Sequence, residues 1–283
     1  MNRPLVLGIL ASLVLAGCGG KGSSGPDHGR PSNVFPAPHA AMPLVAKNGG
    51  SALLKDCPTL ANVASAVVRA IAPLPTTAKI RIGWDADSVN AVRVAKILAE
   101  AGIAALTVHG RTRAQGYSGA ADWNVIGEVA AGISIPVIGN GDLASAADVA
   151  RRRRETGIAG AMIGRAAMSA PWIFRETKAY LATGEIVAPP TLSERWKLIL
   201  RHCELTVHEW GAEEPAIRSM RARLMAYSKS MPEAKRLREK FAHVSTVGEI
   251  QAIAEENILQ SGSVGEAASF HPPREANSFA YSA

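Results

Sequence analysis

Residues 105–142 decide the fold, and they read ALTVHGRTRAQGYSGAADWNVIGEVAAGISIPVIGNGD. They begin with a short β-branched run at Ala105–Val108, continue into an amphipathic stretch at Trp123–Ala131, and end in a second apolar run at Pro136–Ile138. Short β-branched runs that alternate with helical stretches are typical of a parallel sheet with helices outside it. The stretch therefore predicts one complete strand–helix–strand unit.

The same alternation continues on both sides of this unit. Further strands are expected at Ala78–Ile82 and Gly160–Ile163. The strands follow one another at roughly 25 to 30 residues, which is the spacing of a (β/α) barrel. We therefore predict an α/β fold, a partial (β/α)8 TIM-type barrel made of the last four β/α units, with a doubly wound sheet as the alternative. The helices are expected at Val89–Ala101, Trp123–Ala131, Ala146–Glu155 and Pro171–Leu181.

Composition narrows the function classes. The chain has 283 residues, of which 47% are hydrophobic and 19% charged, so it is too apolar for a disordered protein. Cys18, Cys57 and Cys203 lie far apart and without metal-ligand spacing, which argues against a disulfide scaffold and a zinc site, and no metal is expected. The net charge of +7 gives a mild preference for anionic partners.

The N-terminal residues have a different character. Met1–Gly17 resembles a targeting segment, because Arg3 precedes an apolar run that is too short to span a bilayer. The run ends in Leu15-Ala16-Gly17-Cys18, which is similar to a bacterial lipoprotein cleavage box whose cysteine is lipidated. A buried strand or helix is the alternative interpretation. We expect residues 1–43 to be this signal-like segment followed by a disordered linker.

Polar residues gather where the expected strands end, and barrel active sites are built at those ends. Lys79 and Arg81 alternate with apolar residues and so share one face of their strand, the lumen of a barrel. His109 ends the next strand and is a candidate ligand or acid–base group. Glycine-rich turns at Asn140-Gly141-Asp142 and Gly164-Arg165 let backbone N–H groups approach an anion. Each turn alone is also compatible with an ordinary strand-to-helix turn.

Taken together, the motifs resemble those of bacterial tRNA-dihydrouridine synthases, flavin enzymes that reduce a uracil base in tRNA. The resemblance runs from about residue 44 to 257 and suggests that the chain lacks the N-terminal half of the family's barrel. The motifs that carry it are KIRIGW (79–84), LTVHGRTRAQGYSGAADW (106–123), IPVIGNGD (135–142), MIGRAAMSAPWIF (162–174) and MRARLMAYSKSMPEAKRLREKF (220–241).

The resemblance implies FMN as cofactor and NADPH as reductant. Carried over position by position, the residues that would hold FMN are Lys79, His109, Asn140, Gly141, Asp142, Gly164 and Arg165. The residues that would contact the tRNA substrate are Arg81, Arg111, Arg113, Arg218, Arg221 and Arg223.

One departure concerns the proton donor. The family's Asn-x-Gly-Cys-Pro loop, whose cysteine protonates the base, is absent, and His39 lies near its position, so the catalytic residue is unknown. The leading interpretation is therefore a truncated or divergent synthase, which the truncation could leave inactive, and a non-catalytic remnant is one alternative. A lipid-anchored envelope protein that binds a phosphorylated ligand is another. A tRNA substrate predicts the cytoplasm, in conflict with the signal-like segment.

The domain organisation follows from these assignments. Residues 44–185 are expected to form the partial FMN-binding barrel. Apolar residues at helical spacing, with basic residues between them, predict an all-α tRNA-binding domain at 186–258. Residues 259–283 lack periodicity and are expected to be a disordered tail.

Overall fold

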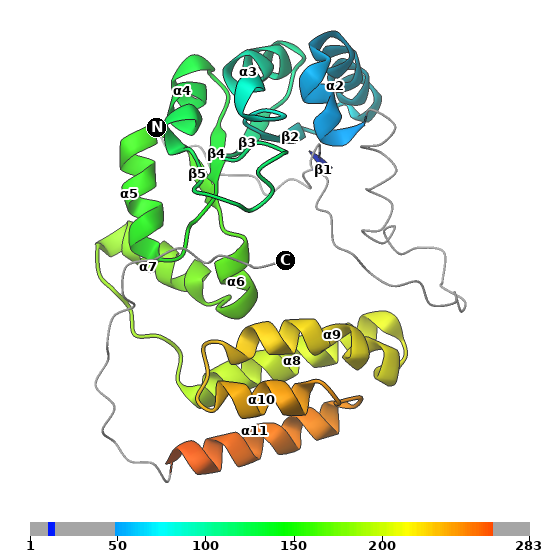
Figure 1. Ribbon diagram of the computed structural model, residues 1–283, viewed down its shortest axis with the longest axis vertical. Coiled ribbons are helices and arrows are strands. Elements are labelled where there is room, and N and C mark those ends of the chain that lie inside the picture. The colour runs from blue at the N-terminus through cyan, green and yellow to red at the C-terminus, as the bar shows by residue number, and fades with distance from the viewer. Residues whose placement is uncertain (1–10, 15–48, 263–283) are drawn as a thin grey trace. The chain divides into compact units, whose positions relative to one another are not determined.

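The computed structural model describes residues 11–14 and 49–262 (Figure 1). The chain divides into two compact units. The first consists of Met1–Leu143 and Val149–Ile163, and the second of Ala144–Asp148 and Gly164–Ala283. The first unit contains the sheet, and the secondary-structure elements described in the second unit are helices. The sequence predicts a domain boundary after residue 185, and the two compact units divide after Ile163. The predicted boundary stays a prediction.

The first unit is built on a parallel sheet with strand order β1-β2-β3-β4-β5. Each described strand pairs in parallel with the next one along the chain. All four strands expected from the sequence are present, which confirms the partial barrel-type α/β fold. The strands are β1 (Ala11–Val14), β2 (Thr76–Arg81), β3 (Ala105–His109), β4 (Val137–Asn140) and β5 (Gly160–Met162).

Strand β1 lies within the segment expected to be a leader. Its residues Ala11 to Val14 pair in parallel with Thr76 to Lys79 of β2. The rest of residues 1–48, including Cys18 and His39, lies outside the described residues. The leader and linker therefore stay predictions.

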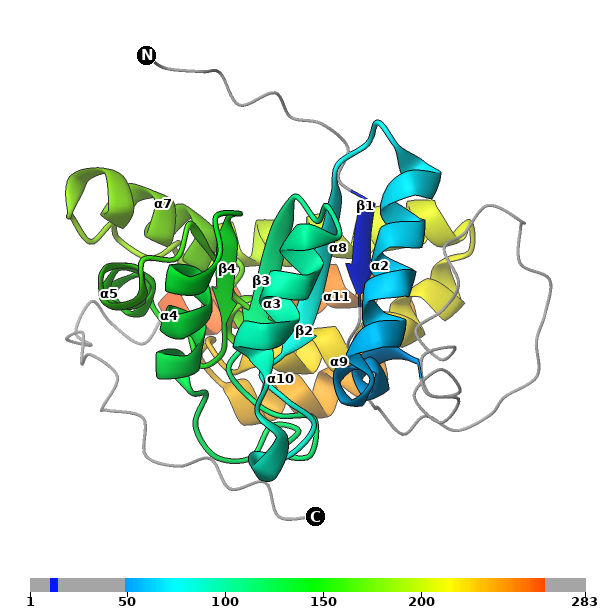
Figure 2. The same cartoon turned by 90° about the horizontal axis from the view of Figure 1, so that it is seen from above.

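Helices α2, α3 and α4 cover one face of the sheet (Figures 1 and 2). Strand residues that point to this face, such as Ile80, Leu106 and Val108, are at most 1% exposed and form its core. Alternation along the strands turns the polar side chains to the opposite face. The helical segments of this unit are η2 (Gly50–Lys55, 3₁₀), α2 (Cys57–Ile71), η3 (Ala86–Ser88, 3₁₀), α3 (Ala91–Glu100), α4 (Trp123–Gly132) and most of α5 (Ala146–Thr156).

Gly139 of β4 leaves room for the buried ring of Trp123. A Cβ atom at this position would lie 2.6 Å from the Trp123 ring and 3.0 Å from Ile158 Cδ1. We therefore expect Gly139→Ala to lower the free energy of unfolding by about 1–3 kcal/mol. Gly160→Ala, in the neighbouring strand, is the matched control, since its Cβ would meet nothing closer than 3.6 Å. Urea unfolding of both variants checks this, and equal stability would contradict it.

The second unit is an all-α domain, as the sequence predicts. Helix α8 begins with a capping box in which Thr191 and Glu194 bond each other's backbone N–H groups. Trp196 packs edge-to-face on Phe241, and its indole N–H donates to Asn257 Oδ1 at 3.0 Å. The helices are α6 (Arg165–Ser169), α7 (Ile173–Thr183), α8 (Leu192–Trp210), α9 (Glu213–Ser228), α10 (Ala234–Phe241) and α11 (Val247–Gly262).

None of the helices in the described part of the chain is both long enough and apolar enough to cross a membrane.

Candidate functional site

Three of the predicted site residues form a row at the carboxyl ends of neighbouring strands. In the strand register Arg81 of β2 pairs with His109 of β3, and His109 pairs with Asn140 of β4. Lys79 lies two residues before Arg81 and therefore on the same face of β2. The sheet brings these four side chains together, as the alternation in the sequence predicts.

His109 stays neutral in this row. Its side chain is buried, with the residue 7% exposed, and burial is the main cause that lowers its pKa from 6.5 to about 3. The positive charges of Arg81, Lys79 and Arg111 lower the pKa further, and Asp142 opposes them. A neutral imidazole surrounded by three cations is suited to contact an anionic or electron-rich ligand. It is not suited to donate a proton as an acid at neutral pH, because it carries no extra proton.

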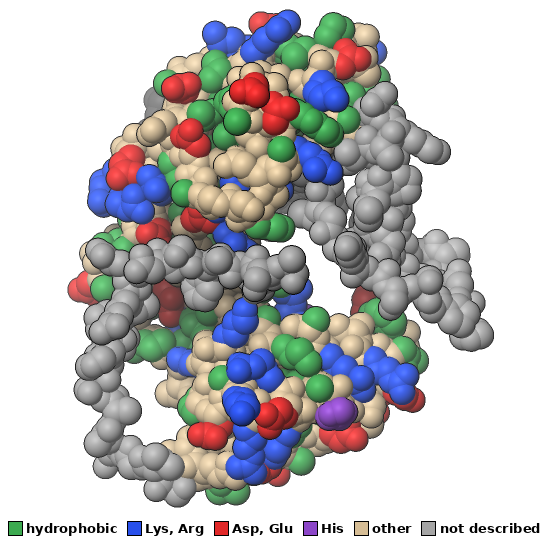
Figure 3. Space-filling model, in the orientation of Figure 1, with side chains coloured by type: hydrophobic (Ala, Val, Ile, Leu, Met, Phe, Trp, Pro, Cys, Tyr) green, Lys and Arg blue, Asp and Glu red, His purple; other side chains and the backbone are tan. Residues whose placement is uncertain are grey.

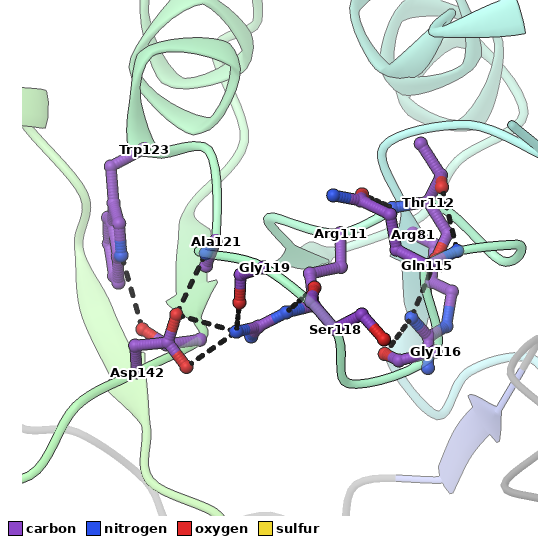
Figure 4. A network of polar contacts seen from close by, with 11 residues as sticks. Arg81, Arg111, Thr112, Gln115, Gly116, Ser118, Gly119, Ala121, Trp123 and Asp142 are labelled. Atoms are coloured by element: carbon purple, nitrogen blue, oxygen red, sulfur yellow. Dashed lines mark hydrogen bonds and ion pairs between the residues drawn. The ribbon is translucent and has the colours of Figure 1, made fainter. Parts of the chain in front are cut away.

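Arg81 holds the loop that follows β3. It is 6% exposed, and its Nη1 donates to the backbone oxygens of Thr112 at 2.8 Å and Gly116 at 3.0 Å (Figure 4). Gln115 Oε1 accepts from the Thr112 N–H at 2.7 Å within the same loop. The structure thus gives Arg81, predicted to contact the substrate, a structural task as well.

Arg111 and Asp142 form an ion pair that closes the other end of this loop (Figure 4). Arg111 Nη2 lies 2.8 Å from one Asp142 carboxylate oxygen and 2.9 Å from the other. The guanidinium also donates to the backbone oxygens of Ser118, at 3.1 Å, and Gly119. Asp142 in turn accepts from the Ala121 N–H at 2.8 Å. Arg111 was predicted to contact tRNA and Asp142 to hold FMN. In the structure, both side chains bond to other groups of the protein.

The turn after β4 is tightly packed. Asn140 Nδ2 donates to the Met162 backbone oxygen at 2.7 Å and so ties β4 to β5. Gly141 has φ of 132°, and a Cβ atom there would lie 2.5 Å from Ala121 Cβ. Trp123 Nε1 donates to the Gly141 oxygen at 3.1 Å. The sequence predicted a glycine for close approach to an anion, and in the structure the close neighbour is Ala121.

Gly164 and Arg165 belong to the second unit, where Gly164 precedes the short helix α6. Their predicted part in a phosphate site stays a prediction.

The predicted RNA-contacting arginines of the helical unit have different surroundings. Arg218 pairs with Glu214 at 2.6 Å, and Arg221 donates to the backbone oxygens of Val244 at 2.9 Å and His243 at 3.1 Å. Lys and Arg side chains lie among acidic ones over α9 and α10 on the face shown in Figure 3. Exposed basic residues without an ion pair among the described residues include Lys229, Lys235 and Arg238.

Arg113 has neighbours that the sequence did not indicate. Its guanidinium carbon lies 5.3 Å from the centroid of the Trp84 ring, and Lys55 Nζ lies 4.5 Å from the same centroid. Lys55 ends η2 and Trp84 follows β2, so only the folded chain brings them together. No group of three or more His, Cys, Asp or Glu side chains within the described ranges could hold a metal ion.

A parallel β/α sheet with basic side chains at its strand ends, joined to an all-α unit, defines a partial (β/α) barrel with a C-terminal helical domain. The family model described as dihydrouridine synthase (Dus) matches residues 43–263. The chain belongs to the dihydrouridine synthase family.

Curated relatives agree with this family. A tRNA-dihydrouridine synthase B of Xanthomonas campestris pv. campestris is 44% identical over 185 residues, which are 65% of this chain and 55% of the relative. One of Pseudomonas aeruginosa is 43% identical over 195 residues, 69% of this chain and 58% of the relative. A probable tRNA-dihydrouridine synthase of Rickettsia conorii is 37% identical over 198 residues, 70% of this chain and 59% of the relative. The chain thus spans little more than half the length of these relatives.

Proposed function

We propose that this chain acts as a tRNA-dihydrouridine synthase, an oxidoreductase that reduces uridine in tRNA with FMN as cofactor and NADPH as reductant. The family and the names of its relatives support the reaction. The observation that carries the proposal is the row of Lys79, Arg81 and neutral His109 at the carboxyl ends of the strands. This row offers positive charge and an uncharged imidazole together.

The residues of the first unit fit FMN. Lys79 and Arg81 beside His109 match the charge of a phosphate or a reduced flavin, and Gly141 keeps a tight backbone turn beside them. Arg111 is not counted, because Asp142 already balances its charge. FMN supplies a hydride carrier when it is bound. Lys79 and His109 are proposed to contact the flavin ring, and the phosphate is assigned to Asn140, Gly141 and Asp142. The resemblance also assigns Gly164 and Arg165 to the phosphate, and this stays a prediction because both belong to the second unit. Because the Asp142 carboxylate pairs with Arg111, we assign its backbone rather than its carboxylate to the phosphate.

The tRNA is proposed to contact basic residues of both units. In the helical unit, Arg218, Arg221 and Arg223 lie on α9, although Arg218 and Arg221 already have acceptors in the protein. Such contacts position RNA without reading its sequence. The cytoplasm is the proposed location, since that is where the proposed tRNA substrate and NADPH are found. The proton donor is unassigned, because the family's cysteine is absent and His39 lies outside the described residues.

Flavin binding tests the proposal directly. We expect the purified full chain to take up FMN, and Lys79→Met to weaken FMN binding about tenfold, the cost of one charge-assisted contact. Lys96→Met is the matched control, since Lys96 is exposed on the outer helix α3. Titration of each protein with FMN, followed by flavin fluorescence, gives the affinities. A wild-type chain that takes up no FMN would refute the proposal.

Restoration of dihydrouridine in synthase-deficient cells then separates an active enzyme from a remnant. A chain that binds FMN but restores no dihydrouridine would be the non-catalytic alternative.

A further inference from the structure

We propose that Lys55, Trp84 and Arg113 form an RNA-binding site, in which the two cations contact phosphates and the indole contacts an unpaired base. This inference rests on the proposed function. The resemblance already assigns Arg113 to the tRNA, and the inference adds Lys55 and Trp84, to which the resemblance assigns no role. We call these three residues the basic–aromatic cluster. The ligand class is single-stranded RNA, such as the loop of a tRNA.

The cluster assembles from three separate segments of the first unit. Lys55 ends η2, Trp84 lies three residues beyond β2, and Arg113 lies four residues beyond β3. Trp84 and Arg113 therefore lie at the carboxyl edge of the sheet, the same edge as the row of Arg81 and His109. A ligand that reaches this row from solvent passes the loops that carry them.

The backbone around Trp84 and Arg113 is held in place. The Arg113 N–H donates to the Gly83 oxygen at 2.9 Å, and the Ala114 N–H donates to the Trp84 oxygen at 2.8 Å. Gly83 packs so closely that a Cβ atom would lie 2.5 Å from the Ser88 oxygen. Arg81 also holds the loop after Arg113 through the Gly116 oxygen. The backbone that carries Trp84 and Arg113 is thus held in place before any ligand arrives, which lowers the entropy cost of binding.

The charges of the cluster lack an acidic partner. Two like charges within 5.3 Å of one indole centroid repel each other, and within the described part of the chain neither Lys55 nor Arg113 forms an ion pair with a carboxylate. The adjacent acids are used elsewhere: Asp56 caps α2 through Thr59, and Asp85 bonds Ser88. An anion that approaches both cations would relieve this repulsion.

The chemistry fits RNA better than a simple anion. Lys55 and Arg113 are exposed, and Trp84 is partly exposed. Cations that follow the backbone, combined with aromatic rings on which bases stack, are the features of proteins that bind single-stranded nucleic acids. Without RNA each cation lies over the indole ring, which is itself favourable. A base that stacks on Trp84 would displace a cation from the ring towards a phosphate.

The test measures binding of a fluorescein-labelled, unmodified tRNA transcript to the full chain by anisotropy at several salt concentrations. Lys55→Gln/Arg113→Gln removes two charges from the cluster. Arg93→Gln/Lys96→Gln removes two charges from exposed positions on α3 and is the matched control. We expect the cluster variant to bind about tenfold more weakly. The slope of log K against log salt should also flatten by about 1.4, or about 0.7 for each phosphate contact to a single strand. The control should keep the wild-type slope.

The indole provides a second readout. Trp84→Leu should bind the transcript about fivefold or more weakly, the low end for loss of one stacked base, whereas Trp84→Phe keeps a ring and should retain most of the affinity. Quenching of tryptophan fluorescence by the transcript should be smaller in Trp84→Phe than in the wild type.

Equal affinity and equal slope for the cluster variant and the α3 control would overturn the inference and leave the proposed function standing. A wild-type chain that takes up FMN but binds no RNA would overturn both the inference and the tRNA substrate.

Discussion

Replacing Asp142 by Asn is expected to lower the free energy of unfolding of the first unit by about 3 kcal/mol. The reason is an asymmetry of exposure: the Arg111 side chain is 3% exposed, whereas that of Asp142 is 35% exposed. Removing the carboxylate leaves a buried guanidinium without its counter-charge, which is the costly way to break such a pair. Asn also tolerates the left-handed backbone at this position, where φ is 50°, so conformational strain adds little.

The variant of the other partner, Arg111→Met, should lower the free energy of unfolding by less than Asp142→Asn. In Arg111→Met the remaining carboxylate is exposed enough to be hydrated, so the loss comes mainly from the Ser118 and Gly119 oxygens that lose a donor. The double variant Arg111→Met/Asp142→Asn should be more stable than Asp142→Asn alone, because no buried charge is left unpaired. Urea unfolding of the three variants forms a double-mutant cycle. Additive losses would show that the two side chains are not coupled.

Peptide-level hydrogen exchange locates the effect. If the pair closes the loop after β3, amides of residues 112–121 should exchange faster in Asp142→Asn, and amides of α8 in the second unit should not change. Faster exchange in both units would mean that the substitution acts on the whole chain rather than on this loop.

Local patterns predicted the strands well because each strand is marked by its own residues. The expected strand at Ala105–Val108 is observed at Ala105–His109, and the alternation at Lys79 and Arg81 placed both on the polar face. Strand pairing then follows from the order of parallel β/α units. Such features depend on neighbours in the chain, so one sequence is enough to find them.

The tasks of the arginines were not predictable in this way. Arg111 contacts Asp142, which lies 31 positions away, and the backbone oxygens it binds carry no sequence signal. The local sequence around an arginine that follows a strand does not show whether its side chain binds a ligand or bonds to its own loop. The sequence likewise does not indicate a role for Lys55, because its contact with Trp84 exists only once η2 packs beside the sheet.

His109 is expected to make the first unit sensitive to acid. Its folded-state pKa is about 3, below the 6.5 of an exposed histidine, because burial and the positive charges of Arg81, Lys79 and Arg111 all disfavour the imidazolium. Between these two pH values the His109 imidazole binds a proton in the unfolded chain but not in the folded chain. Stability from this residue is therefore complete above pH 6.5 and is lost as the pH falls towards 3, by up to about 1.4 kcal/mol for each pH unit.

His109→Gln isolates this contribution, since glutamine is polar and does not titrate. The variant should lose less stability than the wild type between pH 6.5 and pH 4, so the difference between the two proteins shrinks or reverses as the pH falls. Carboxylates titrate equally in both proteins and cancel in the comparison. Urea unfolding at each pH measures the free energy of unfolding of both proteins. Pulse-labelling hydrogen exchange of the β2 and β3 peptides, with the labelling at one fixed pH, assigns the unfolding to the first unit. Parallel curves for the two proteins would mean that the pKa of His109 is the same in the folded and the unfolded chain. In that case the imidazole would gain its proton near pH 6.5, and burial and the neighbouring cations would not be what keeps it neutral at the strand ends.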